Sequence, residues 1–243
     1  MKMSSGVPSM IQLADRQLRN WELARLQRPE RHAPLRQEVE DFIAVSRMVG
    51  VDGDGVAAAL GASLGWPVFG QNLLEAMAGH DPVRQRLYNA MDERDLTWWE
   101  EAVRGVMDRS FVRNDYFRRL CETILTLARK GSAIFVGRGA DLILPPARGL
   151  RVQLVASRES RIRRFATDLG LEASEAETQI QEIEHQRADF ARKHFGAEAL
   201  DPLRHDLILN MDRWSLEPAT ALILEARKLR HGSRVPVRTP RSG

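Results

Sequence analysis

Residues 42–64 read FIAVSRMVGVDGDGVAAALGASL, and this stretch predicts the start of an α/β domain. Its first four residues form a short apolar run that suits a buried parallel strand. Three glycines at 50, 53 and 55 then predict a turn, and the alanine-rich residues 56–64 predict a helix. A strand, a glycine loop and a helix within about 25 residues form the arrangement that phosphate-binding proteins use.

Further apolar runs extend this unit into a sheet. Short strands are predicted at 67–69, 133–136, 152–155 and 206–209, and helical patterns fill most of 71–130, notably 95–109 and 113–129. Strands that alternate with helices indicate parallel pairing with right-handed crossovers. The predicted fold class is therefore α/β, a three-layer, doubly wound, five-stranded parallel sheet.

The chain divides into three parts. Residues 1–37 are an N-terminal extension in which Leu18 and Trp21 mark an amphipathic helix over 10–27, a candidate for homodimer contacts. Residues 38–230 form the domain, with a charged helical insert at about 158–196 that could close over a ligand as a lid. The tail at 231–243 has no periodicity and is expected to be disordered.

Composition narrows the class of protein. The 243 residues carry a net charge of +3, with 36 basic and 33 acidic side chains, and contain a single cysteine, Cys121. No stretch approaches the roughly 20 apolar residues of a membrane helix, and no secretory signal is evident. A soluble cytoplasmic protein with no membrane partner is predicted. Nucleic-acid binding is disfavoured because the charges balance and no recognition motif is present, and the six histidines show no metal-ligand spacing.

The glycine loop is the first candidate site. Glycines at a strand-to-helix turn let backbone N–H groups converge on an anion, and the residues predicted to form this loop are Ser46, Arg47, Gly50, Asp52, Gly53, Asp54 and Gly55. The lysine and the Ser/Thr of a full G-x-x-x-x-G-K-[ST] motif are absent. Asp52 and Asp54 instead bring negative charge to the position of a triphosphate. Taken alone, the loop fits a structural turn as well as a phosphate cradle.

Arginines form the second candidate site. Arg138 lies between two glycines at the end of the third major strand, where ligands of doubly wound sheets bind, and Asp141 follows it. Arg161 and Arg164 share a helical face of the lid, and Arg187 lies further along it. Arginines on a lid suit phosphoryl transfer, which depends on charge neutralisation, whereas exposed helical arginines are often only solvated surface.

The order of these pieces resembles the cytidylate kinase-like family of P-loop proteins. The matching stretches run from about Phe42 to Leu229 and comprise Ser46-Arg47 with the glycine loop, Gly65 to Phe69, Asp92-Glu93-Arg94, Val136 to Ala140, Arg161 to Arg164, Glu184 to Arg187, Asp201-Pro202, and Asp206 to Asn210 followed by Asp212. The resemblance implies a nucleoside triphosphate donor with Mg²⁺, a nucleoside monophosphate acceptor and an arginine-bearing lid.

Residue by residue, the resemblance makes Gly50 and Gly53 part of the phosphate loop, with Arg138 and Asp141 at the acceptor. Arg138, Arg161, Arg164 and Arg187 become the catalytic residues, no protein metal ligand is expected, and ATP with Mg²⁺ is the expected cofactor. The loop departs from the family's usual G-S-G-G-R-E. The resemblance makes transfer of a phosphoryl group from ATP to a CMP-type acceptor the first predicted function. The alternative is a catalytically inactive kinase-like protein that binds a nucleotide, another phosphorylated ligand or a protein partner.

Overall fold

The structure is a computed structural model that describes residues 39–79, 115–196, 199 and 201–232, together with Arg16. The predicted helices at 10–27 and 95–109, and residues 233–243 of the predicted tail, lie outside these residues apart from Arg16. The elements in chain order are β1 (Phe42–Arg47), α2 (Gly53–Leu64), β2 (Val68–Phe69), α3 (Gln71–Gly79), α6 (Asp115–Lys130), β3 (Ala133–Val136), α7 (Ala140–Ile143), β4 (Gly149–Val155), α8 (Arg158–Leu169), α9 (Ala173–Phe195), η3 (Pro202–Arg204), β5 (Leu207–Asn210) and α10 (Leu216–Gly232).

The five strands form one parallel sheet in the order β2-β3-β1-β4-β5. Ala44 of β1 pairs with Phe135 of β3 on one side and with Arg151 of β4 on the other. Each strand returns through a helix, as parallel pairing requires. The predicted α/β fold class and all five predicted strands are confirmed.

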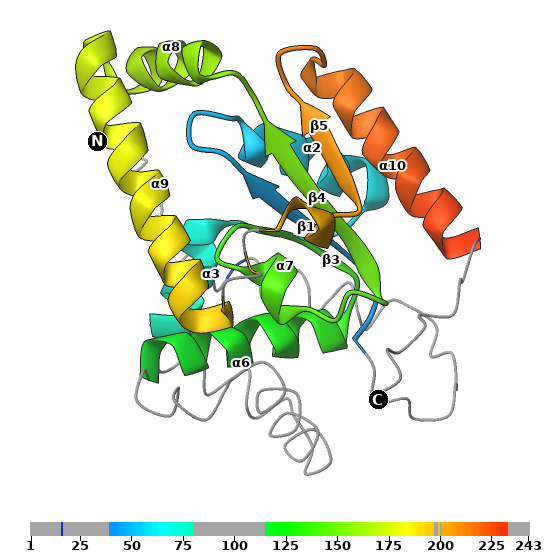
Figure 1. The fold of residues 1–243 in the computed structure, drawn as a ribbon. Coiled ribbons are helices and arrows are strands. Elements are labelled where there is room, and N and C mark those ends of the chain that lie inside the picture. Colours follow the sequence, from blue (N-terminus) through cyan, green and yellow to red (C-terminus); the bar gives the residue numbers. More distant parts are fainter. Residues whose placement is uncertain (1–15, 17–38, 80–114, 197–198, 200, 233–243) are drawn as a thin grey trace, which may run out of the picture.

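Alternate side chains of the central strands enter two separate cores. Phe42 and Ala44 pack on the α6 side of the sheet, with Phe69 and Phe135 from the neighbouring strands. Ile43 and Val45 face the opposite side, where α2 and α10 supply a second cluster. Burial on both faces explains why β1 reads as a continuous apolar run. Figure 1 shows the resulting layers, with α6 and α10 on opposite sides of the sheet.

The insert between β4 and β5 folds into two helices. Short α8 crosses the end of the molecule where the strands finish, and long α9 runs from there back toward α6 (Figure 1). Aromatic side chains fix the far end of α9, since Phe117 of α6 lies with its ring centroid 5.7 Å from that of Phe190, 5.3 Å from Phe195 and 4.3 Å from His194. The insert therefore packs on the domain at both ends.

Helix boundaries differ slightly from the predicted ones. α2 begins at Gly53, three residues before the predicted start, because Asp52 caps it. α10 ends at Gly232, two residues into the predicted tail. Within the described part of the chain, no helix combines the length and the apolar character needed to cross a bilayer.

Candidate functional site

The β1–α2 loop leaves the carboxyl end of the central strand and carries its own cap. Gly50 adopts a φ of +81°, a conformation in which glycine escapes the steric cost of a side chain. The carboxylate of Asp52 then turns back over the first turn of α2, and its Oδ1 accepts a hydrogen bond of 2.7 Å from the Gly55 N–H. A backbone donor that a bound anion could use is thus already paired within the protein.

Arg47 links this loop to the end of β3. Its aliphatic stem lies against Gly53, where a Cβ would collide with Arg47 Cδ. Its Nη2 lies 3.5 Å from Asp54 Oδ2, and its Nη1 is close enough to Gly137 that a Cβ there would be 3.2 Å away. The Arg47 side chain is only 15% exposed, so its guanidinium is held in the cleft rather than in open solvent.

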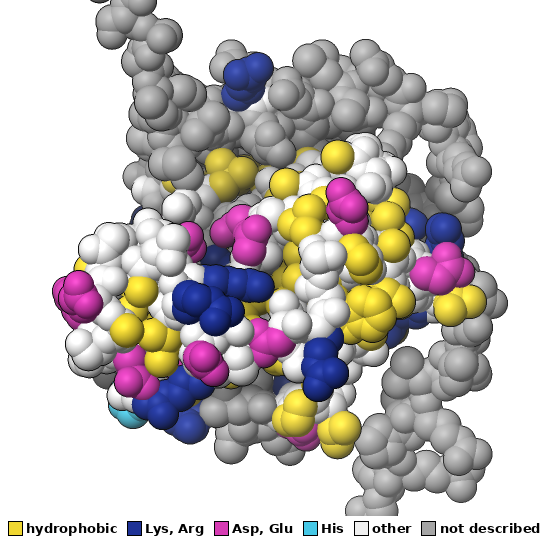
Figure 2. Space-filling model, turned by 90° about the horizontal axis from the view of Figure 1, so that it is seen from above, with side chains coloured by type: hydrophobic (Ala, Val, Ile, Leu, Met, Phe, Trp, Pro, Cys, Tyr) yellow, Lys and Arg dark blue, Asp and Glu magenta, His cyan; other side chains and the backbone are white. Residues whose placement is uncertain are grey.

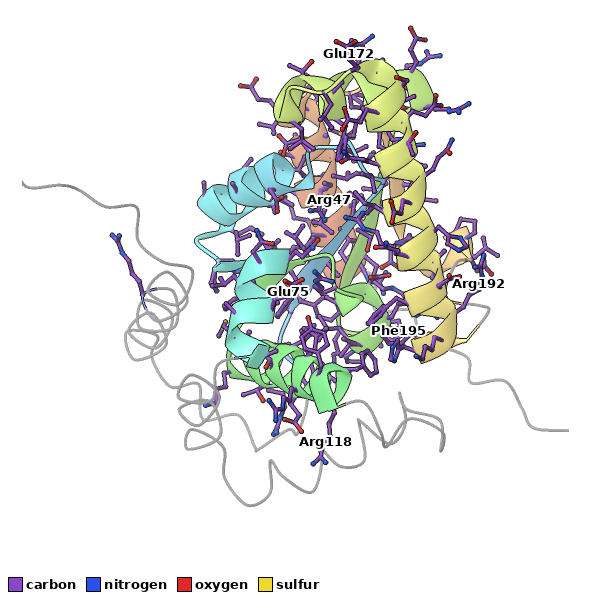
Figure 3. The ribbon with its side chains drawn as sticks, turned by 90° about the vertical axis from the view of Figure 1, so that its left-hand side faces the viewer. Arg47, Glu75, Arg118, Glu172, Arg192 and Phe195 are labelled. Atoms are coloured by element: carbon purple, nitrogen blue, oxygen red, sulfur yellow. The ribbon has the colours of Figure 1, made fainter. Side chains whose placement is uncertain are left out.

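Arg138 is held by an unusual backbone. Gly137, Arg138 and Gly139 have successive φ values of +70°, +53° and +68°, and Arg138 is the sole non-glycine residue with positive φ among those described. Such a conformation is strained for a residue with a Cβ. The guanidinium forms an ion pair with Glu75 of α3, while its buried Nε has no hydrogen-bond partner in the part of the chain that the structure describes. Figure 3 shows Glu75 on α3 and Arg47 above it, between α2 and α9.

Arg187 reaches the same place from α9. Its Nη1 donates a hydrogen bond of 3.3 Å to the main-chain carbonyl of Arg47. Burial, followed by the charges of Arg47 and Arg138, lowers the pKa of the Arg187 guanidinium, and the charge of Glu184 opposes this only in part. Burial with the charge of Arg47 lowers the pKa of Arg138. No carboxylate among the described residues forms an ion pair with Arg187. We call Arg47, Arg138 and Arg187 the arginine cluster; its mutual repulsion would be relieved by a bound anion.

The two arginines of α8 that were predicted to lie on a lid differ in depth. Arg161 is buried, and its Nη1 donates to Glu184 Oε1 at 2.6 Å and to the Val49 carbonyl at 3.4 Å. It therefore ties α8 to α9 and to the β1–α2 loop, although the resemblance implies that it faces a transferring phosphoryl group. Arg164 lies at the pocket with its Nη2 3.5 Å from the Met211 carbonyl.

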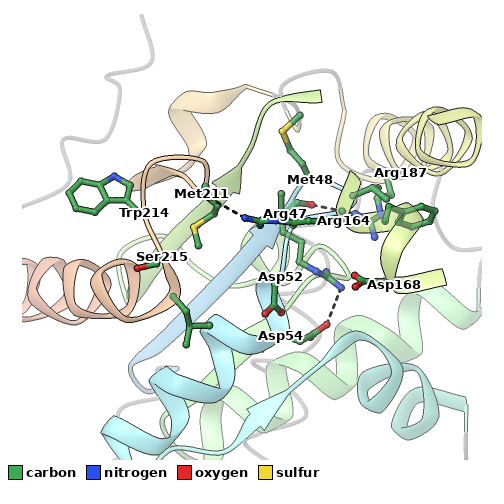
Figure 4. A pocket seen from close by; sticks show the side chains of 15 residues that line it. Arg47, Met48, Asp52, Asp54, Arg164, Asp168, Arg187, Met211, Trp214 and Ser215 are labelled. Atoms are coloured by element: carbon green, nitrogen blue, oxygen red, sulfur yellow. Dashed lines mark hydrogen bonds and ion pairs between the residues drawn. The ribbon is translucent and has the colours of Figure 1, made fainter. Parts of the chain in front are cut away.

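A pocket of about 630 Å³ opens beside the arginine cluster, a size typical of small-molecule sites. It is bounded by the β1–α2 loop, by α8 and α9, and by the loop that joins β5 to α10. Figure 4 shows Arg47, Arg164 and the carboxylates of Asp52, Asp54 and Asp168 around its centre, with Trp214 and Ser215 at its far side. The pocket thus offers basic, acidic and apolar groups to one ligand.

The predicted acceptor residue Asp141 lies beneath the site. It is 9% exposed, and its Oδ2 lies 3.6 Å from His205 Nε2. Burial raises the pKa of Asp141, but the neighbouring side chains of His205 and Ser46 outweigh burial, so the pKa lies below its ordinary value. Ser46, predicted in the phosphate loop, thus lies beside Asp141 at the end of β1 and helps to lower its pKa.

A loop-bound Mg²⁺ does not fit these residues. The hydroxyl that would hold the ion in a standard phosphate loop is absent, the Asp52 carboxylate caps α2, and Asp54 is paired with Arg47. Among the described residues, no group of three or more Asp, Glu, His or Cys side chains could hold a metal ion.

Some site residues gave no signal in the sequence. Glu75, the partner of Arg138, is an ordinary helical glutamate until the fold brings α3 beside β3. Met211 and Trp214 follow β5, so their position after a predicted strand was the available clue. Asp212, which the resemblance did include, lies in the same loop, where its Oδ2 accepts a hydrogen bond of 2.6 Å from the Ser157 N–H at the start of α8.

The surface over this end of the molecule is mixed in charge. Figure 2 looks onto it and shows dark blue basic side chains between magenta acidic ones, with no unbroken basic face. Nucleic-acid binding draws its affinity from many phosphate contacts. The pattern in this view suits a small anionic ligand better than a polyanion.

Comparisons with known proteins agree with this architecture. Residues 42–213 match the model of a family described as the cytidylate kinase-like family. No protein of curated function matches the chain.

Solved structures include similar folds. An uncharacterized protein from Eubacterium ventriosum is 20% identical with a TM-score of 0.62, over 80% of this chain and 99% of that one. Shikimate kinase from Bacteroides thetaiotaomicron is 16% identical with a TM-score of 0.42, over 76% and 96% of the two chains. A Thermus thermophilus protein is 21% identical with a TM-score of 0.40, over 77% and 98%.

Proposed function

The chain belongs to the cytidylate kinase-like family, and from this premise we propose that it binds a phosphorylated nucleotide in the cleft at the carboxyl ends of β1 and β3. The observation that carries the proposal is the arginine cluster. Arg47, Arg138 and Arg187 come from three separate elements, and the charge of Arg47 helps to lower the pKa of both Arg138 and Arg187. An arrangement of like charges that costs stability is typical of a functional site.

The free donors of the cluster suit a phosphate ester. Among the described residues, one nitrogen of Arg138 has no hydrogen-bond partner, and the hydrogen bond that Arg187 donates goes to a main-chain carbonyl. Arginine binds phosphate through a planar fork, so several forks can share the oxygens of one phosphate. The adjoining pocket of about 630 Å³ has room for the rest of a nucleotide, with Met211, Phe165 and Leu216 as apolar surface.

Phosphoryl transfer from ATP to a CMP-type acceptor is the second candidate function. It is favoured by the lid, because Arg164 and Arg187 line the pocket that the β1–α2 loop also lines. Two features count against it: the β1–α2 loop lacks the lysine of a standard phosphate loop, and its described residues do not fit Mg²⁺. Phosphoryl transfer relies on such groups to neutralise charge on the transferred group. We infer that nucleotide binding is the main function, in a protein that we expect to be cytoplasmic.

The test is a calorimetric titration of the full chain with CMP and AMP. The wild type should bind, and the affinity of Arg187→Ala should be about tenfold or more lower, because the variant loses one charge-assisted hydrogen bond to the phosphate. The matched control is Arg192→Ala on the same helix, because Arg192 pairs with Asp189 and lies on the outer side of α9 (Figure 3). Equal affinity of the two variants would contradict the proposal, as would no binding by the wild type.

Phosphoryl transfer is tested separately. A coupled assay with ATP, Mg²⁺ and CMP would detect ADP production. Turnover that Arg164→Ala abolishes, and that Arg163→Ala leaves unchanged, would establish the second candidate.

A further inference from the structure

The β1–α2 loop has the backbone shape of an anion cradle and is already filled. In a working cradle, the N–H groups at the start of the helix point at a ligand phosphate, and the positive end of the helix dipole favours its charge. Here the Asp52 carboxylate occupies that position and accepts the Gly55 N–H at 2.7 Å. A Cβ on Gly55 would collide with the same carboxylate, so the group lies directly against the first turn.

The other sides of the loop are closed as well. A Cβ on Gly50 would lie 2.6 Å from the Arg161 carbonyl oxygen, so the backbone of α8 covers the loop from above. Arg161 also donates to the Val49 carbonyl. The Arg47 stem lies against Gly53 on the side that faces β3. A phosphate could enter the loop only by displacing Asp52.

We propose that Asp52 is a specificity-determining residue that closes the loop to polyphosphates, so that the cleft takes a nucleotide with a single phosphate on the arginine cluster. This inference rests on the proposed function. A monophosphate needs only the cluster, which lies toward β3 and α9. A triphosphate would extend into the loop and bring its charge against the carboxylates of Asp52 and Asp54.

An aspartate that caps a helix also has a purely structural role, which the test must separate. Asp52→Ser keeps a side-chain acceptor for the Gly55 N–H, since serine caps helices about as well as aspartate, and it removes the charge. The matched control is Asp168→Asn, which removes a carboxylate from the α8 side of the same pocket and leaves the loop intact.

The experiment titrates CMP and CTP into the wild type and both variants by calorimetry, with thermal melts as a check on folding. We expect the wild type to bind CMP more tightly than CTP, and Asp52→Ser to gain about tenfold or more in CTP affinity while its CMP affinity changes little. Asp168→Asn should leave the ratio of the two affinities close to that of the wild type. Equal CMP and CTP affinities in the wild type that Asp52→Ser does not change would overturn the inference and leave the proposed function standing.

Two further outcomes separate the proposals. A gain of CTP binding in Asp52→Ser, with no CMP binding in any protein, would overturn the proposed function and the single-phosphate part of the inference, and would support only the closure of the loop by Asp52. An equal gain of CTP affinity in Asp168→Asn would show that general pocket charge sets the selectivity, and it would overturn the inference.

Discussion

Arg138 can be tested by two substitutions that separate its backbone from its side chain. Arg138→Ala and Arg138→Gly both remove the guanidinium and both lose the ion pair with Glu75. Alanine has a Cβ, so holding it at the φ of +53° costs roughly 1–2 kcal/mol, as it does for other residues with a Cβ. Glycine avoids that strain but gains unfolded-state freedom that costs roughly 0.5–1 kcal/mol.

The balance makes Arg138→Gly more stable than Arg138→Ala by about 0.5–1 kcal/mol, which corresponds to about 1–4 °C in Tm for a domain of this size. Both variants should lose CMP affinity alike, by about tenfold to hundredfold, because each loses charge-assisted hydrogen bonds worth about 1.5–3 kcal/mol. Differential scanning calorimetry and titration calorimetry measure the two effects. An alanine variant as stable as the glycine variant would refute the backbone reasoning, and unchanged CMP affinity would refute the phosphate contact.

Three other substitutions or treatments test the surroundings of the site. Asp141→Asn should lower stability at pH 7 by about 1–3 kcal/mol. The pKa of Asp141 is lower in the folded state than in the unfolded state, where it is about 3.9, so the ionised carboxylate stabilises the fold above that pH. This stabilisation is lost as the pH falls through the folded pKa. The free energy of unfolding in urea should therefore depend less on pH across this acid range in Asp141→Asn than in the wild type. Arg161→Ala should cost about 1.5–3 kcal/mol and speed amide hydrogen exchange in α8, since it removes the bonds to Glu184 and Val49. Burial, with the charge of Glu122, raises the pKa of Cys121 to about 12, so iodoacetamide at pH 8 should label the thiol only after unfolding, as mass spectrometry would show.

Each of these predictions has a control or an outcome that would contradict it. Arg163→Ala, on the exposed side of α8, should stay within about 0.5 kcal/mol of the wild type. An acid profile of Asp141→Asn parallel to that of the wild type would count against the Asp141 bonds. Rapid labelling of Cys121 in the native protein would contradict its burial in α6.

The fold could be predicted from the sequence because its signals are local. Each strand is a short apolar run next to a turn, and the continuous run at 42–45 reports burial on both faces of β1. The start of α2 could have been placed correctly as well, since Asp52 stands three residues before Gly55 in the position of an N-cap. Its effect on the loop required the structure, because the sequence does not show where the carboxylate points.

The site could be predicted only in part. Arg138 was recognised from its glycine neighbours, but its convergence with Arg47 and Arg187 depends on how α9 packs, which is a tertiary property. Arg161 and Arg164 share a helical face in the sequence, yet one is buried against the loop and the other lines the pocket. Helical spacing predicts which face of a helix a side chain occupies, but it does not predict how deeply that side chain is buried.

The long helix α9 is attached near its carboxyl end, so a change in its tilt would displace its two ends by different amounts. It spans 23 residues, and its aromatic attachment to Phe117 lies at its carboxyl end. With a rise of about 1.5 Å per residue, a tilt of about 10° around that pivot would carry Ala173 through about 6 Å but Arg187 through only about 2 Å. Such a tilt would displace the α8 end of the insert about three times as far as the arginine that would hold a phosphate.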